Sequence, residues 1–137
     1  MSFYQEVGGH PTFVRLVGGF YAGVADDPPL RALYPEADLA AAQQRLLMFL
    51  EQYFGGPTAY SQQRGHPRLR MRHAPYAVTP QQRDRWLGHM LASVDELAAD
   101  GTLDSAHVAV LRDYLTRAAD MLVNSGVVGP PPIPGGS

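Results

Sequence analysis

Apolar residues recur at spacings of three and four along four long segments of this chain. This spacing places the apolar side chains on one face of an α-helix, and no segment shows the alternation of apolar and polar residues that is typical of a half-buried strand. The sequence therefore predicts an all-α fold with four substantial helices. Their apolar faces consist of Phe13, Leu16, Val17, Phe20, Tyr21 and Val24; of Leu39, Ala42, Leu46, Phe49, Leu50 and Tyr53; of Trp86, Leu87, Met90, Leu91, Val94 and Leu97; and of Val108, Leu111, Leu115, Ala118, Met121 and Leu122.

Glycines, prolines and capping residues predict where the first helices begin and end. Ser2 and Gln5 have the spacing of a capping box, which predicts a very short first helix that ends at Gly8-Gly9. The second helix is expected to end near residues 26–29, because proline disfavours a helical residue before it. A short helical turn is expected over residues 30–33.

The later boundaries follow from similar signals. Asp38 is expected to cap the next long helix. Thr79 and Gln82 form a second capping-box pattern around a proline, and the helix that they open is expected to end by Gly101. A last helix is expected from about Asp104.

The connection from Pro57 to Val78 is long, rich in proline and arginine, and without a sustained period. An up-down bundle joins its helices by short loops, whereas a long irregular connection inside a compact domain is uncommon and often functional. We therefore expect this segment to cover a bound group such as a cofactor.

Length, composition and net charge exclude several classes of protein but do not indicate a particular chemistry. One domain is expected over residues 1–128, and the Gly- and Pro-rich residues 129–137 are expected to form a disordered tail. The absence of cysteine excludes disulfides and thiolate ligands, and the net charge of −2 argues against general nucleic-acid or membrane-surface binding. No apolar run is long enough to span a bilayer and no signal peptide is visible, so we expect a cytoplasmic protein.

His73 differs from the other four histidines because a basic segment with Arg64, Arg68, Arg70 and Arg72 precedes it. Three interpretations remain open for this segment. A basic run is most often a solvated loop, but it can also contact phosphate or nucleic acid. It can also hold a dianionic cofactor whose carboxylates face the arginines while the imidazole binds the metal. Haem, which has two propionates and an iron that histidine commonly ligates, is such a cofactor.

Tyr21 and Trp86 each lie on the apolar face of a predicted helix. Such residues are usually core residues that form one hydrogen bond. The alternative is that the O–H and N–H groups donate to a bound ligand, as polar groups around haem do.

Four stretches of the chain together resemble the truncated haemoglobins. Residues 20–35 are similar to the second helix and the following turn of that family, and residues 45–57 are similar to its distal helix. Residues 65–76 resemble the proximal-histidine segment of group II, the O-type, and residues 83–87 resemble its tryptophan-bearing helix. The resemblance extends over about residues 3–125.

The resemblance implies a two-over-two helical sandwich around haem b. Applied residue by residue, it implies His73 as the proximal iron ligand and Tyr21, Tyr34 and Trp86 as the polar distal trio. It implies Ala42 and Leu46 at the distal-helix positions above the haem, where a small alanine would leave ligand entry less obstructed. The further contacts that it suggests are Phe49, Leu69, Tyr76 and Met90 with the haem ring and Arg72 with a propionate.

Binding of O2, CO, NO or similar small ligands at a penta-coordinate iron is the function that the resemblance implies. Three donors would hold oxygen firmly, which favours NO or peroxide chemistry with a reductase partner; an oxygen store, transporter or sensor is the non-enzymatic alternative. We expect a monomer or homodimer with no nucleic-acid partner and no stable membrane association. A haem-free helical interaction module, which would use the basic segment Arg64–Arg72, is the alternative of another class.

Overall fold

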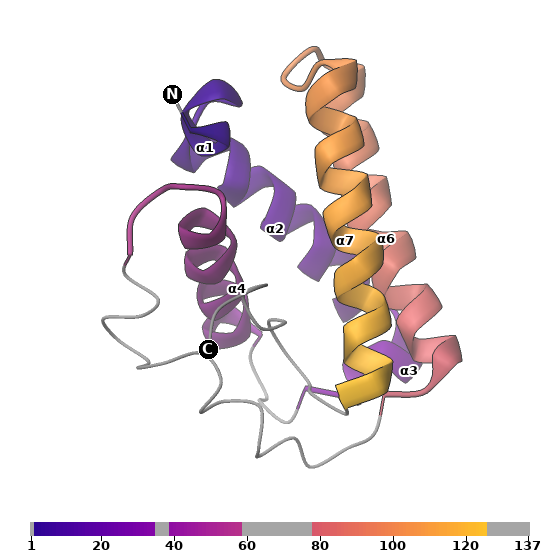
Figure 1. The fold of residues 1–137 in the computed structure, drawn as a ribbon. Helices are drawn as coiled ribbons and strands as arrows, with labels where there is room; N and C mark the ends of the chain where they lie inside the picture. Colours follow the sequence, from indigo (N-terminus) through magenta and orange to yellow (C-terminus); the bar gives the residue numbers. More distant parts are fainter. Residues whose placement is uncertain (1, 35–38, 59–77, 126–137) are drawn as a thin grey trace.

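The computed structural model describes residues 2–34, 39–58 and 78–125, with side chains through Met121 (Figure 1). None of these residues forms a strand, which confirms the all-α prediction. The described helices are α1 (Phe3–Glu6), α2 (His10–Ala25), α3 (Pro28–Arg31), α4 (Ala40–Tyr53), α6 (Pro80–Ala99) and α7 (Ser105–Ser125).

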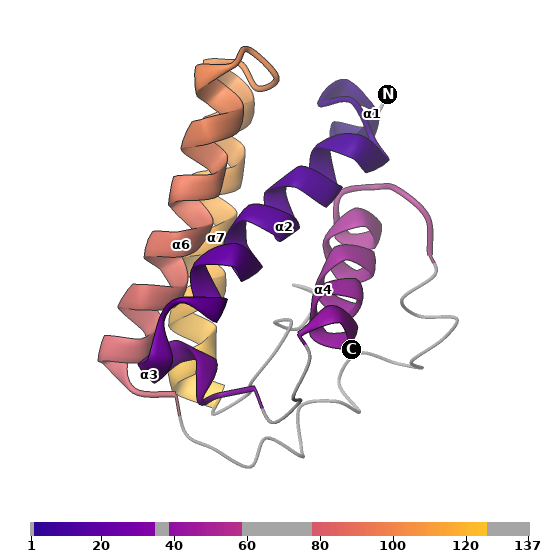
Figure 2. The same cartoon turned by 180° about the vertical axis from the view of Figure 1, so that it is seen from behind.

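The four long helices form two pairs. Helices α6 and α7 lie side by side and run in opposite directions, while α2 crosses α6 and also packs against α4 (Figures 1 and 2). The short helix α3 follows α2 and contacts both α2 and α6. This arrangement confirms the predicted two-over-two sandwich, and it brings the start of α6 close to the corner between α2 and α3.

Both predicted capping boxes are present. The Ser2 hydroxyl accepts from the Gln5 N–H at 3.3 Å, and the Ser2 N–H donates to the Gln5 side chain at 3.2 Å. At the start of α6 the corresponding Thr79–Gln82 distances are 3.1 and 3.0 Å. These reciprocal bonds satisfy N–H groups that the first turn of a helix leaves free, so they fix where each helix begins.

One predicted boundary is wrong by two residues. Helix α3 covers Pro28–Arg31 instead of residues 30–33, because Pro28 and Pro29 occupy its first turn, where a missing N–H is tolerated. Helix α4 begins at Ala40, directly after Leu39. Asp38, which the sequence predicts to cap this helix, lies outside the described residues, so that prediction stays open.

The core joins the predicted apolar faces. Among the fully buried side chains are Phe13, Phe20, Phe49, Leu16, Leu30, Leu50, Met90, Leu97, Leu111 and Leu115. Helix α4 is more enclosed than one apolar face requires, because every residue from Leu46 to Glu51 is buried. The buried Glu51 carboxylate pairs with His10 Nδ1 at 2.7 Å, which offsets the desolvation of its charge.

Helices α2 and α6 cross closely at two glycines of α2. A Cβ added at Gly19 would lie 2.5 Å from Ser93 Oγ, and one at Gly23 would overlap the ring of His89. The Ser93 hydroxyl donates to the Leu16 carbonyl oxygen at 2.8 Å at this crossing. The missing side chains therefore let the backbone of α2 approach the polar side of α6.

Some predictions fall outside this description. The connection from residue 59 to 77 and the tail 129–137 lie outside the described residues. Within residues 2–34, 39–58 and 78–125, no helix combines the length and apolar character that crossing a membrane requires.

The Asp100 carboxylate, at the end of α6, is expected to make stability pH-dependent in acid. It accepts from the hydroxyl and the N–H of Thr102 at 2.6 and 3.0 Å and pairs with Arg15 of α2. The bond from the Thr102 hydroxyl, followed by that from Arg15, lowers the pKa of Asp100 from 3.8 to about 2. Because the folded pKa lies below the unfolded one, the stabilisation is present above the unfolded value and is lost as the pH falls toward the folded one.

The Asp100→Asn variant is therefore expected to show a shallower loss of stability than the wild type between about pH 4 and pH 2. Urea unfolding followed by circular dichroism at a series of pH values measures this slope. Equal slopes in the two proteins would contradict the prediction.

Tyr114, on α7, is a core residue whose hydroxyl lacks a partner. It is 4% exposed and packs on Tyr53 and Phe54 at ring-centroid distances of 4.3 and 5.4 Å. Its oxygen forms no hydrogen bond in the part of the chain that the structure describes, and burial raises the pKa of this phenol. Tyr114→Phe keeps the ring and removes the unpaired polar group, so the free energy of unfolding is expected to rise by about 1 kcal/mol. A lower urea midpoint than in the wild type would contradict this expectation.

Candidate functional site

The three polar aromatic residues of the predicted distal trio lie on three different elements. Tyr21 is on α2, Tyr34 follows α3, and Trp86 is on the second turn of α6. Their exposed fractions are 4%, 7% and 4%. The rings of Tyr21 and Tyr34 meet edge to face, with centroids 5.6 Å apart. The structure therefore brings these two tyrosines into direct contact, although 12 residues of mixed helix and turn lie between them.

Phe20 connects Trp86 to the tyrosines. Its ring centroid lies 5.5 Å from that of Trp86 and 4.8 Å from that of Tyr21, in edge-to-face geometry in both cases. Sequence reasoning placed Phe20 only among the core residues of its helix. Its position next to Tyr21 was the available signal, but periodicity alone does not show which helix face a large ring contacts.

The polar atoms of Tyr21 and Trp86 are held differently. The Tyr21 hydroxyl donates to the Ala42 carbonyl oxygen in the first turn of α4 at 3.3 Å. The Trp86 side chain is 4% exposed and packs on Phe20, and its indole N–H forms no hydrogen bond with another described residue. A donor without a partner among the described residues is available to an acceptor from outside the chain.

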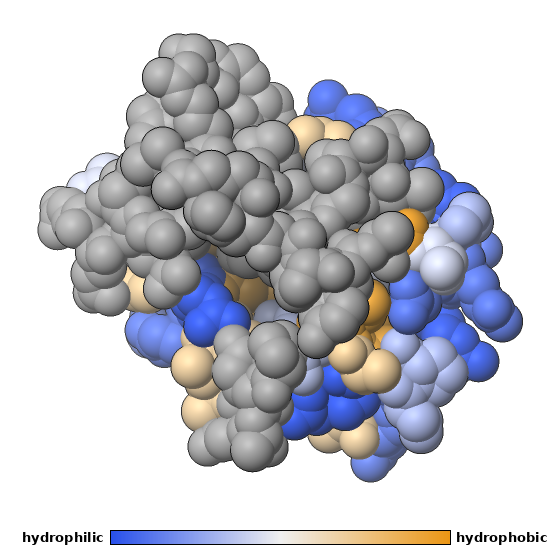
Figure 3. Space-filling view, turned by 90° about the horizontal axis from the view of Figure 1, so that it is seen from below, coloured by the Kyte–Doolittle hydropathy of each residue, from blue (hydrophilic) through white to orange (hydrophobic). Residues whose placement is uncertain are grey.

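An apolar wall accompanies the trio. Ala42, Leu46 and Phe49 share one face of α4, at spacings of four and three, and are 3%, 2% and 0% exposed. Met90 lies one turn after Trp86 on α6 and is 0% exposed. On the face of the molecule seen from below, where α3 and the starts of α4 and α6 lie, apolar patches appear between hydrophilic ones (Figure 3). The four predicted cofactor-binding residues that fall on described residues are thus buried, while their contact with a cofactor stays a prediction.

The remaining predicted site residues lie in the connection between α4 and α6. His73, Leu69, Arg72 and Tyr76 are outside the described residues. Among the residues that the structure describes, no group of three histidine, cysteine or acidic side chains could hold a metal ion. The described site supplies the apolar wall and the hydrogen-bond donors.

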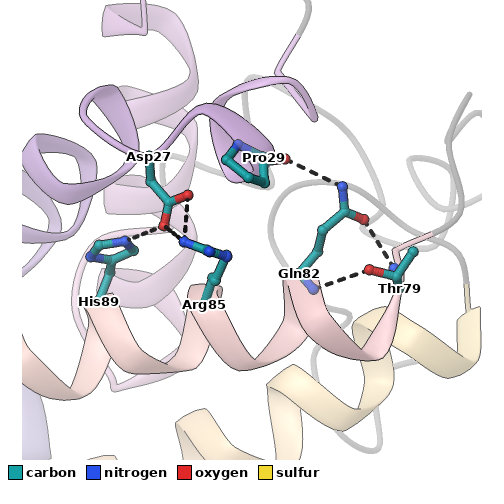
Figure 4. Close-up of polar contacts among 6 residues, drawn as sticks. All are labelled: Asp27, Pro29, Thr79, Gln82, Arg85 and His89. Carbon is teal, nitrogen blue, oxygen red and sulfur yellow. Dashed lines mark hydrogen bonds and ion pairs between the residues drawn. The ribbon is translucent and has the colours of Figure 1, made fainter.

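A buried acidic residue that sequence reasoning did not single out lies beside this site. Asp27 is 6% exposed, and its carboxylate accepts from Arg85 Nη1 at 3.0 and 3.1 Å and from His89 Nε2 at 2.8 Å (Figure 4). The bond from His89, supported by Arg85, lowers the pKa of Asp27. Nearby, the Gln82 amide donates to the Pro29 carbonyl oxygen at 3.3 Å.

Comparisons with known proteins place the chain in a family. The family model of bacterial-like globins matches residues 2–120. The group 2 truncated haemoglobin YjbI of Bacillus subtilis is 37% identical over 100 residues, which make up 73% of this chain and 74% of that protein.

Solved structures agree with this family. The thermostable haemoglobin of the actinobacterium Thermobifida fusca has a TM-score of 0.83 and 55% identity, over 90% of this chain and 98% of that one. The truncated oxygen-avid haemoglobin of Bacillus subtilis has a TM-score of 0.79 and 33% identity, over 90% of this chain and all of that one.

Haem is the cofactor of this family, and the described residues fit it. The buried face of α4 and Met90 supply apolar surface against which a ring can pack, and the indole N–H of Trp86 is a hydrogen-bond donor without a partner among the described residues. The chain belongs to the bacterial-like globins, and within them it is a group II truncated haemoglobin that binds small gaseous ligands at haem.

Proposed function

We propose that this protein binds oxygen, and also CO and NO, at a haem beside the distal trio, and that His73 is the residue that would hold the iron. Haem supplies a ferrous iron with an open position for a diatomic ligand. The chain would supply the hydrogen-bond donors: the indole N–H of Trp86, the hydroxyl of Tyr34, and the hydroxyl of Tyr21 once it turns from the Ala42 carbonyl oxygen, to which it donates in this structure, to the ligand. Ala42, in place of a larger residue, leaves the entry to the ligand site open.

The observation that carries this proposal is the burial of the trio around Phe20, with an indole N–H that has no acceptor among the described residues. Oxygen that binds ferrous haem gains partial negative charge, so a donor beside it stabilises the bound form and slows its release. Hydrogen bonds to charged groups contribute about 1.5–3 kcal/mol, more than those between neutral groups. Further support comes from the relative in Bacillus subtilis that is described as oxygen-avid.

The other half of the haem environment is assigned to the connection between α4 and α6. Arg72 would pair with a propionate, and Leu69 and Tyr76 would contact the ring together with Phe49 and Met90. The basic character of this segment supports the assignment, because carboxylates and guanidinium groups form strong bidentate hydrogen bonds.

A protein that releases oxygen slowly is better suited to a reaction of the bound oxygen than to its delivery. In the reaction that we propose, NO, the retained oxygen and one electron would give one nitrate; the haem would supply that electron, and an external one-electron reductant such as a reductase would replace it. Peroxide reduction by the same reductant is a second reaction of this kind. An oxygen store, transporter or sensor is the non-enzymatic alternative, and it requires faster release of oxygen.

Two stopped-flow measurements on the purified holoprotein test this proposal. Displacement of oxygen by CO is expected to be slow, and mixing the oxygenated protein with NO is expected to form one nitrate per haem before any oxygen leaves. Release of oxygen faster than the reaction with NO would overturn the enzymatic proposal and favour a store or sensor. A colourless protein that fails to take up haem would instead favour the interaction module with the basic segment Arg64–Arg72.

A further inference from the structure

Asp27 occupies the corner between α2 and α3 but directs its carboxylate to α6. Its main-chain oxygen accepts from the N–H groups of Leu30 and Arg31 at 3.1 and 2.8 Å, which begins α3. Its side chain does not cap that helix. Instead its carboxylate accepts hydrogen bonds from Arg85 and His89, which are one turn apart on α6 (Figure 4). We call these three residues the Asp27 clamp.

The two clamp residues of α6 flank Trp86 in the sequence. Arg85 is the residue before Trp86, and His89 follows it by three positions. Two anchors on one turn limit both rotation of the helix about its axis and displacement along it. The indole of Trp86 therefore takes its position partly from a carboxylate that it does not touch.

The same corner is connected to both tyrosines of the trio. Tyr21 lies on α2, six residues before Asp27. After the corner, the Arg31 guanidinium of α3 donates to the Tyr34 carbonyl oxygen at 2.8 Å. A shift of the corner relative to α6 would thus change the distance between the indole donor and the two phenols.

A glycine of α2 lets this helix approach α6 closely beside the clamp. Gly23 lies one turn before Asp27 and faces the ring of His89, so a side chain at this position would overlap the imidazole. The Asp27 carboxylate is 7% exposed, while the side chains of Arg85 and His89 are 44% and 30% exposed. The acceptor is enclosed and its two donors reach it from the surface.

We propose that Asp27 is a positioning residue for the ligand site, because its contacts with Arg85 and His89 set where the indole of Trp86 stands. This inference rests on the proposed role of the trio as donors to the ligand. It predicts that loss of the Asp27 charge moves Trp86 and weakens the hold on oxygen without removing any donor.

The test uses the only tryptophan of the chain as its own reporter. Holoprotein labelled with 5-fluorotryptophan gives one ¹⁹F resonance in the diamagnetic CO form. We would compare Asp27→Asn with the wild type by this resonance, by the C–O stretching frequency and by the oxygen dissociation rate. The expected result is a shifted ¹⁹F line, an altered C–O stretch and oxygen release that is about 3- to 20-fold faster.

Two further variants keep the experiment decisive. Arg85→Gln removes one anchor at a half-exposed position, so it serves if Asp27→Asn does not fold, and it is expected to shift the same readouts in the same direction. Asp100→Asn is the matched control, because it breaks an ion pair between the same two helices at the far end of α6. It is expected to leave all three readouts at their wild-type values.

Several outcomes would overturn the inference. Asp27→Asn and Arg85→Gln could lower the urea midpoint and leave the ¹⁹F line, the C–O stretch and oxygen release unchanged, which would make the clamp purely structural. Equal shifts in Asp100→Asn would show a general loosening of the crossing. If Trp86→Phe leaves oxygen release unchanged, the proposed role of Trp86 as a donor fails. A ¹⁹F shift in Asp27→Asn would still support the positioning of Trp86 in that case.

Discussion

The His73→Ala variant is expected to lose the sharp Soret band of the wild-type protein in its ferric, reduced and CO forms. The chain has no cysteine whose thiolate could replace the imidazole as the iron ligand. Changing a hydrogen-bond partner of a metal ligand already lowers metal affinity by about 10- to 100-fold, and loss of the ligand itself is expected to exceed this. Absorption spectra after haem reconstitution, together with the rate of haem transfer to an acceptor globin, measure the effect.

A second histidine of the same segment provides the control. His66→Ala changes the basic segment in the same way but leaves the assigned ligand in place. It is expected to keep the wild-type spectrum, and added imidazole is expected to restore a Soret band to His73→Ala. If His66→Ala loses the band and His73→Ala retains it, the assignment of the iron ligand is wrong.

Oxygen is expected to leave the Trp86→Phe variant about 10- to 100-fold faster than it leaves the wild type. Phenylalanine keeps the contact with Phe20 and removes the indole N–H. Loss of one hydrogen bond to a charged acceptor costs about 1.5–3 kcal/mol, and a factor of ten corresponds to about 1.4 kcal/mol. Stopped-flow displacement of oxygen by CO measures the rate.

Tyr114→Phe is the matched control for this experiment. It also removes one polar group from a buried aromatic ring, but this ring packs on Tyr53 and Phe54 and not on the trio. Its oxygen dissociation rate is expected to equal that of the wild type. An unchanged rate in Trp86→Phe, or equal acceleration in both variants, would contradict a specific donor role for Trp86.

The positions of the long helices could be predicted because their signals are local. The Thr79–Gln82 pattern placed the start of α6, since the reciprocal bonds form within one turn. The start of α3 could not be placed in the same way, because two prolines both end one helix and suit the first turn of the next.

The trio could be named from a resemblance, but its packing and the Asp27 clamp could not be predicted. Periodicity assigns Phe20 to an apolar face without showing which ring it meets on α6. The contacts of Asp27 with Arg85 and His89 join residues 58 and 62 positions apart. Such pairs depend on the crossing of two helices, which a single sequence does not specify.

The close crossing at Gly19 and Gly23 has a mechanical consequence. Helices that slide past each other normally do so by small rearrangements of the side chains between them. Where Ser93 and His89 of α6 face bare backbone, no flexible side chain of α2 is present to absorb such shear. We therefore expect α2 and α6 to move as one rigid body. Any displacement that accompanies ligand entry is then expected in α4, whose first turn is connected to α2 by the hydrogen bond from the Tyr21 hydroxyl.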